Sequence, residues 1–151
     1  MRKSFAVTFF LYVLTAFHHF YGAKVYNTPW RTHVVLLGGG VLLLSLVLLL
    51  LHHWFAKRVY LVFYWLLTFI VFGIGIGIFE GGYNHLVKNI LFFSGVNMKI
   101  LRTLYPSPTY EMPDNFLFEA TGILQFFAGV LLIYYLTSIF KRVFSARVII
   151  S

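Results

Sequence analysis

Four long hydrophobic stretches dominate the chain. They cover residues 4–23, 34–55, 59–79 and 116–140, and apart from Glu119 none of them contains a charged residue. Each is close to the ~20 residues that a helix needs to span the hydrocarbon core of a bilayer. Lipid offers the backbone no hydrogen-bond partner, so continuous apolar runs of this length favour helices over barrel strands. The pattern predicts an all-α integral membrane protein, with four transmembrane helices in a single domain, residues 1–151.

The first stretch carries a stripe of polar and small residues. The stripe repeats at helical spacing and consists of Thr8, Thr15, His18, His19 and Gly22. Polar groups are unfavourable against acyl chains, so we expect this face to contact the other helices.

Glycines mark the faces expected to pack closely. Three glycines spaced four apart begin in the third stretch and end just beyond it, and the fourth stretch has two glycines spaced seven apart: Gly73, Gly77, Gly81, Gly122 and Gly129. A missing side chain lets a neighbouring helix approach, as in small-xxx-small pairs of membrane helices. Glu80 and Glu119 lie beside these two glycine faces.

The connection between the third and fourth stretches has its own pattern. Residues 84–104 place Lys88, Lys99 and Arg102 on one arc of an otherwise apolar segment, which predicts an amphipathic helix in the membrane surface, either continuous or broken near Ser94 and Gly95. Three prolines in residues 105–113 exclude a helix there. We expect the third helix to end near Phe79, and Asp114 or Asn115 to cap the fourth.

Charge is distributed unevenly between the two ends of such a bundle. The end with both termini and the turn at residues 52–58 has no acidic residue and seven basic ones: Arg2, Lys3, Lys57, Arg58, Lys141, Arg142 and Arg147. The other end has five basic residues and all four acidic ones: Glu80, Glu111, Asp114 and Glu119. The positive-inside rule therefore predicts cytoplasmic termini in a cell membrane, either a plasma membrane or a bacterial inner membrane.

The composition of the chain excludes some kinds of chemistry and some classes of binding partner. The chain has no cysteine, which excludes thiol–disulfide chemistry and cysteine-ligated metals. Its formal net charge is +8, but the basic residues are scattered at helix ends, so anionic lipid on the cytoplasmic face is the expected partner rather than nucleic acid. We also expect a homo-oligomer or a larger membrane complex, because the glycine faces suit helix partners.

One cluster of residues offers chemistry at the acidic end. Imidazole and carboxylate groups there suit zinc, iron or copper, and the candidate ligands are His18, His19, Glu80, His85 and Glu119. The spacing matches no known motif. Adjacent histidines point about 100° apart on a helix, and residues five apart share a face only if the helix ends at the glycines. The alternative is that Glu80 and Glu119 pair separately with basic residues in the membrane interface.

Two functional hypotheses follow from these patterns. The first is a non-enzymatic accessory subunit or binding component of a membrane complex, because no catalytic spacing accompanies the glycine faces. The second is a metal-dependent membrane enzyme or a proton-coupled carrier that uses the His/Glu cluster.

Overall fold

The computed structural model describes residues 1–144, in which all regular structure is helical. The elements are α1 (Arg2–Val25), η1 (Pro29–Thr32), α2 (His33–Phe55), α3 (Arg58–Leu67), η2 (Thr68–Val87), α4 (Lys88–Phe93), α5 (Met98–Leu104) and α6 (Phe116–Phe144). Arg147, one of the basic residues counted above, lies outside the described residues.

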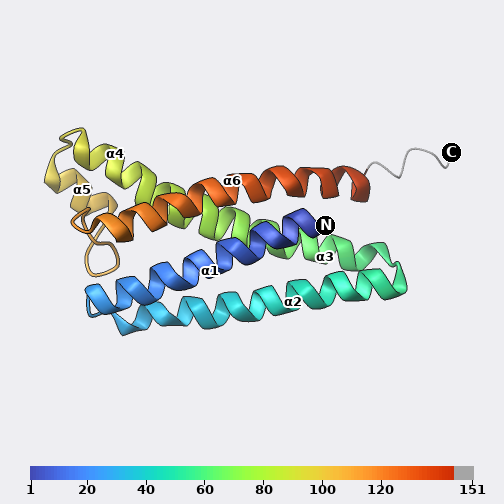
Figure 1. Ribbon diagram of the computed structural model, residues 1–151. Helices are drawn as coiled ribbons and strands as arrows, with labels where there is room; N and C mark the ends of the chain where they lie inside the picture. The colour runs from blue at the N-terminus through green and yellow to red at the C-terminus, as the bar shows by residue number, and fades with distance from the viewer. Residues whose placement is uncertain (145–151) are drawn as a thin grey trace.

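Four helices in the described range are long and apolar enough to cross a membrane. They span Arg2–Val25, Pro29–Phe55, Arg58–Phe93 and Phe116–Lys141. Figure 1 shows them side by side, with the N-terminus and the α2–α3 turn at one end, which we call the terminal end. The α1–α2 connection, α4 and α5 lie at the opposite end, here called the distal end.

The third helix differs from the sequence-based expectation. It continues through the glycines to Phe93 instead of ending near Phe79, and Thr68–Val87 is wound as a π-helix. A π-helix has i→i+5 hydrogen bonds, so residues five apart, such as Glu80 and His85, lie next to each other. The segment 84–104 is not a single interfacial helix either. It is the end of this long helix, a turn at Gly95 with φ +76°, and the short helix α5.

The polar stripe of α1 faces the other helices as expected. Its five members, Thr8, Thr15, His18, His19 and Gly22, are all buried. Thr8 and Thr15 each donate a hydrogen bond to the carbonyl four residues earlier, at 2.9 and 2.7 Å. The threonine hydroxyls are therefore satisfied within the helix, whereas the two histidine rings are available for contacts with other elements.

Helices η2 and α6 pack so closely that the backbone of one contacts the backbone of the other. A Cβ added to Gly77 would lie 2.6 Å from the Cα of Gly129, and one added to Gly81 would collide with the backbone of α6 at Phe126. Closer to the distal end, a Cβ on Gly122 would collide with the ring of His85. The glycines of both helices therefore bring η2 and α6 together and leave room for His85 between them.

The core lies between α1, α3, η2 and α6. Its fully buried members include Leu11, Tyr64, Phe72, Leu132 and Leu136. Large apolar side chains also cover the outside of the bundle, and Leu36, for example, is 80% exposed. A soluble monomer rarely exposes extended apolar surface, whereas a bilayer would cover it.

The loop before α6 follows the expectation for a proline-rich segment. No helix forms between Leu104 and Phe116. Asn115 caps α6, because its side-chain oxygen accepts a hydrogen bond from the backbone N–H of Phe118 at 3.0 Å. The loop folds back over the distal end, where its residues contact side chains of α1, η1 and α4.

The contact between Gly77 and Gly129 generates a stability prediction. We expect Gly77→Ala to lower the melting temperature of the protein in detergent, with a loss of about 1–3 kcal/mol, because the added methyl group meets backbone that cannot rotate away. Gly40→Ala is the matched control, since a Cβ at Gly40 meets nothing within 4 Å. Equal melting temperatures for the two variants would show that the η2–α6 contact does not determine stability.

Candidate metal centre

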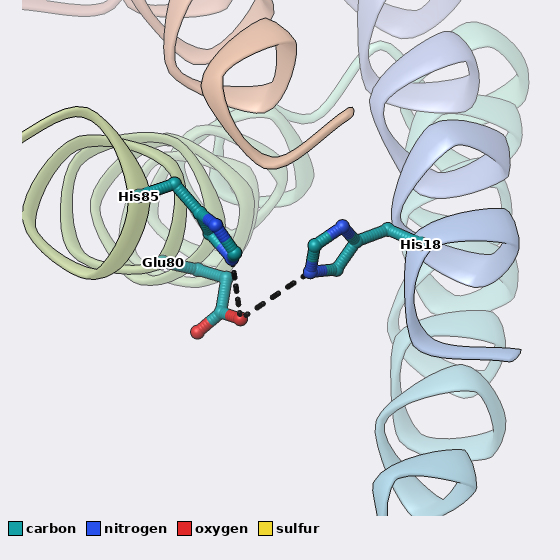
Figure 2. A group of neighbouring side chains, drawn as sticks. All are labelled: His18, Glu80 and His85. Atoms are coloured by element: carbon teal, nitrogen blue, oxygen red, sulfur yellow. Dashed lines mark ion pairs between the residues drawn. The ribbon is translucent and has the colours of Figure 1, made fainter. Parts of the chain in front are cut away.

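A cluster of ionisable side chains lies inside the distal end of the bundle. His18 and His19 come from α1, Glu80 and His85 from η2, and Glu119 from the first turns of α6. Figure 2 shows His18 on one helix pointing toward Glu80 and His85 on the other. The cluster therefore forms only where these helices pack together.

Glu80 occupies the centre of the cluster. Its Oε1 atom lies 4.0 Å from His18 Nε2, 3.8 Å from His19 Nε2 and 3.9 Å from His85 Nε2. These separations are too long for hydrogen bonds. The other carboxylate oxygen, Oε2, accepts a hydrogen bond from Asn84 Nδ2 at 2.7 Å. Asn84 thus holds the carboxylate so that Oε1 faces the imidazoles.

Hydrogen bonds orient two of the three imidazole rings. His85 Nδ1 donates to Glu119 Oε2 at 2.8 Å, since an ionised carboxylate can only accept. His18 Nδ1 donates to Thr121 Oγ1 at 2.9 Å, because Thr121 uses its own proton on the carbonyl of Leu117 at 2.8 Å. Both rings therefore carry a proton on Nδ1, and the Nε2 atom of each ring faces Glu80.

Glu119 is held in place by three side chains. Besides His85, it accepts hydrogen bonds from Lys88 Nζ at 2.9 Å and from Asn89 Nδ2 at 2.5 Å. Lys88 Nζ also donates to the carbonyl of Glu111 at 2.6 Å. The Lys88 and Glu119 side chains are only 2% and 7% exposed, so this is a buried and fully paired ion pair.

Aromatic rings and a second ion pair cover the cluster from the loop side. The Arg31 guanidinium lies 3.3 Å from Glu111 and its carbon lies 5.1 Å from the centre of the Trp30 ring. Tyr26 donates to Asp114 Oδ1 at 2.6 Å. Burial, together with this hydrogen bond to a carboxylate, raises the pKa of Tyr26, so the phenol stays protonated as a donor.

Three of these residues have the composition of a metal site. One ligand atom each from His18, Glu80 and His85 lie within 4.8 Å of one another. A tetrahedral ion with ligand bonds of ~2.0–2.1 Å separates its ligand atoms by about 3.4 Å. The two gaps between Glu80 and the histidines, 4.0 and 3.9 Å, would therefore close by roughly half an ångström around an ion, and the two histidine nitrogens would approach each other by at most about 1.4 Å. His18 Nε2 is fully buried and has no hydrogen-bond partner among the described residues.

The five residues singled out in the sequence take different positions in this arrangement. His18, Glu80 and His85 form the ligand group, and His19 adjoins it through Glu80. Glu119 is not beside Glu80 but on the other side of His85, whose two nitrogens face the two carboxylates. It is therefore placed to orient a ligand rather than to be one.

Sequence reasoning missed the residues that hold the cluster in place. Lys88 was expected on a surface helix but is buried against Glu119. Asn84 and Asn89 each follow a site residue by four positions, Glu80 and His85 respectively, and this spacing was the signal that could have identified them. The i, i+5 pair Glu80–His85 was judged unfavourable, because α-helical geometry was assumed for a segment that is π-helical.

A comparison of the chain with known protein families, curated proteins and solved structures found no match.

The buried Lys88–Glu119 pair generates the next prediction. We expect Lys88→Met to destabilise the protein by about 3–5 kcal/mol, because it leaves a buried carboxylate without its cation. Thermal unfolding in detergent measures this, with Lys99→Met as the control at an exposed position. Adding Glu119→Gln to Lys88→Met should recover part of the loss, since the uncompensated charge is removed. If both lysine variants melt alike, the ion pair carries no stabilising role.

Proposed function

We propose that this protein is an integral membrane protein that binds one transition metal ion, Zn²⁺ or Fe²⁺, at the distal end of its helix bundle. The protein ligands are His18 Nε2, Glu80 Oε1 and His85 Nε2. Glu119 and Thr121 act on the ion indirectly, by fixing the proton and the orientation of the two imidazoles.

The main observation in support of this proposal is that two carboxylates face the same imidazole ring at different distances. Glu119 approaches His85 Nδ1 to 2.8 Å, as a hydrogen-bonded pair does. Glu80 stays 3.9 Å from Nε2 of the same ring, and about as far from His18. Two imidazole nitrogens and a carboxylate oxygen that converge without hydrogen bonds to one another suit a cation between them.

The composition of the ligand group supports the choice of metal. Two histidines and one carboxylate, with further positions open, occur in catalytic zinc sites and in non-haem iron(II) sites. A carboxylate that orients a ligating histidine through its second nitrogen is a common supporting feature of such sites. The Glu119–His85 hydrogen bond has this arrangement.

The membrane setting follows from the four apolar helices and their exposed apolar surface. The basic residues at the terminal end favour a cytoplasmic location for that end, next to anionic lipid. In that orientation the metal cluster would lie toward the opposite face of a cell membrane.

The glycine faces, by contrast, no longer argue for an accessory subunit. They are the feature that suggested partner helices, and Gly77, Gly81, Gly122 and Gly129 contact other elements of this same chain. A metal-binding role therefore has more specific support than a role defined by an unidentified partner chain.

Metal analysis of the purified protein tests the proposal. We expect close to one equivalent of zinc or iron per chain, and loss of that metal in Glu80→Gln and in His85→Ala. Glu119→Gln should retain metal with an affinity about 10–100-fold lower, as for other residues that orient a metal ligand. His53→Ala, a histidine at the terminal end, is the control and should bind normally. A wild-type protein that binds none of these metals refutes the proposal.

Cysteine labelling tests the orientation of the protein in the membrane. No native cysteine interferes with the labelling, because the chain has none. Ser107→Cys in the distal loop should react with an impermeant thiol reagent added to intact cells. His53→Cys at the terminal end should react only after the membrane is opened. The reverse pattern would place the metal cluster at the cytoplasmic face.

A further inference from the structure

A small cavity adjoins the metal cluster beside Glu80. It has a volume of about 190 Å³, and its walls include Val34, Glu80, Asn84 and His85. Of the three proposed ligands, the His18 and His85 side chains are 0% and 3% exposed, whereas Glu80 is 22% exposed. The cluster is therefore closed by protein on the histidine sides and reached through the cavity beside Glu80.

We infer that the metal ion keeps an exchangeable coordination position facing this cavity, and that this position takes a small monoanion in place of water. The inference rests on the proposed metal site and adds the class of ligand that the site accepts. Three protein ligands leave at least one position free on Zn²⁺ or Fe²⁺.

Two residues that line the cavity have buried polar atoms without a partner, which supports an exchangeable ligand. Asn84 Oδ1 and His19 Nδ1 are buried and have no hydrogen-bond partner among the described residues. Asn84 is fixed by the bond from its Nδ2 to Glu80, so its oxygen remains available as an acceptor. Buried acceptors are nearly always satisfied, and a water molecule on the metal would supply the missing donor.

The charges around the cavity favour an anion as the replacing ligand. Two carboxylates, Glu80 and Glu111, and two cations, Arg31 and Lys88, line the cavity, so their formal charges cancel. A divalent ion would give the cavity a net positive charge. A monoanion would offset part of that charge, and Arg31 and Lys88 line the cavity through which it enters.

Size sets the upper limit on the ligand. A volume of about 190 Å³ corresponds to roughly six water molecules at ~30 Å³ each. Ligands of a few heavy atoms, such as azide, formate or acetate, fit this space.

Cobalt substitution tests the inference on the full-length protein in detergent. The purified protein is loaded with Co²⁺, whose visible absorption bands report its coordination, and is then titrated with sodium azide. We expect a saturable change in the bands that reverses when azide is removed. Val34→Trp, which fills the cavity without touching a ligand, should weaken the azide response roughly tenfold or more, at unchanged cobalt uptake. Leu36→Trp, on the outer surface of the same helix, is the matched control and should respond as wild type does.

The outcomes separate this inference from the proposed function. Cobalt binding with no azide response would mean that a fourth protein ligand, such as His19, closes the site. That result would refute the exchangeable coordination position but not the metal site itself. An azide response that is equal in wild type and Val34→Trp overturns the cavity as its route. If Val34→Trp fails to fold, Arg31→Met is the second variant. An azide affinity per bound cobalt that equals that of wild type would likewise overturn the cavity as the route of the anion. A protein that takes up no cobalt overturns both proposals.

Discussion

The close approach of η2 and α6 is the constraint on which the rest of this structure depends. Gly77 meets Gly129 backbone to backbone, and Gly122 leaves the space that the His85 ring fills. With side chains at these positions the helices would separate, and His85 could not stand between Glu80 and Glu119. The glycine contacts thus provide both the packing of the bundle and the position of its central imidazole, which links stability directly to the site.

The site also depends on how a group of buried charges is balanced. Glu119 is neutralised by Lys88 and held by Asn89, so its hydrogen bond to His85 is fixed in direction. Among the residues that the structure describes, no such cation lies within hydrogen-bonding distance of Glu80; its Oε1 faces imidazole nitrogens at 3.8–4.0 Å. The two carboxylates therefore differ in role because of their partners: one is satisfied by protein, and the other is left available for a cation.

The π-helical winding of Thr68–Val87 brings the ligands of η2 onto one face. In an α-helix residues five apart diverge, whereas i→i+5 winding stacks them. π-helical segments are uncommon and occur frequently at functional sites. Here the winding aligns Glu80 with His85 and also directs Gly73, Gly77 and Gly81 toward α6, so the same geometry serves packing and ligand placement.

The sequence by itself determined the helical class, the four apolar helices, the buried stripe of α1 and the concentration of acidic residues at one end. These follow from local composition and periodicity, since apolar runs of this length and polar residues at helical spacing have few alternatives. Only the tertiary structure decided that the third helix continues to Phe93, that Lys88 is buried, and that His85 separates the two carboxylates. The helical winding and the rotation of α6 about its axis depend on contacts between residues more than thirty positions apart, as between His85 and Glu119. Local pattern carries no information about such contacts, and they decide which of the candidate residues face one another.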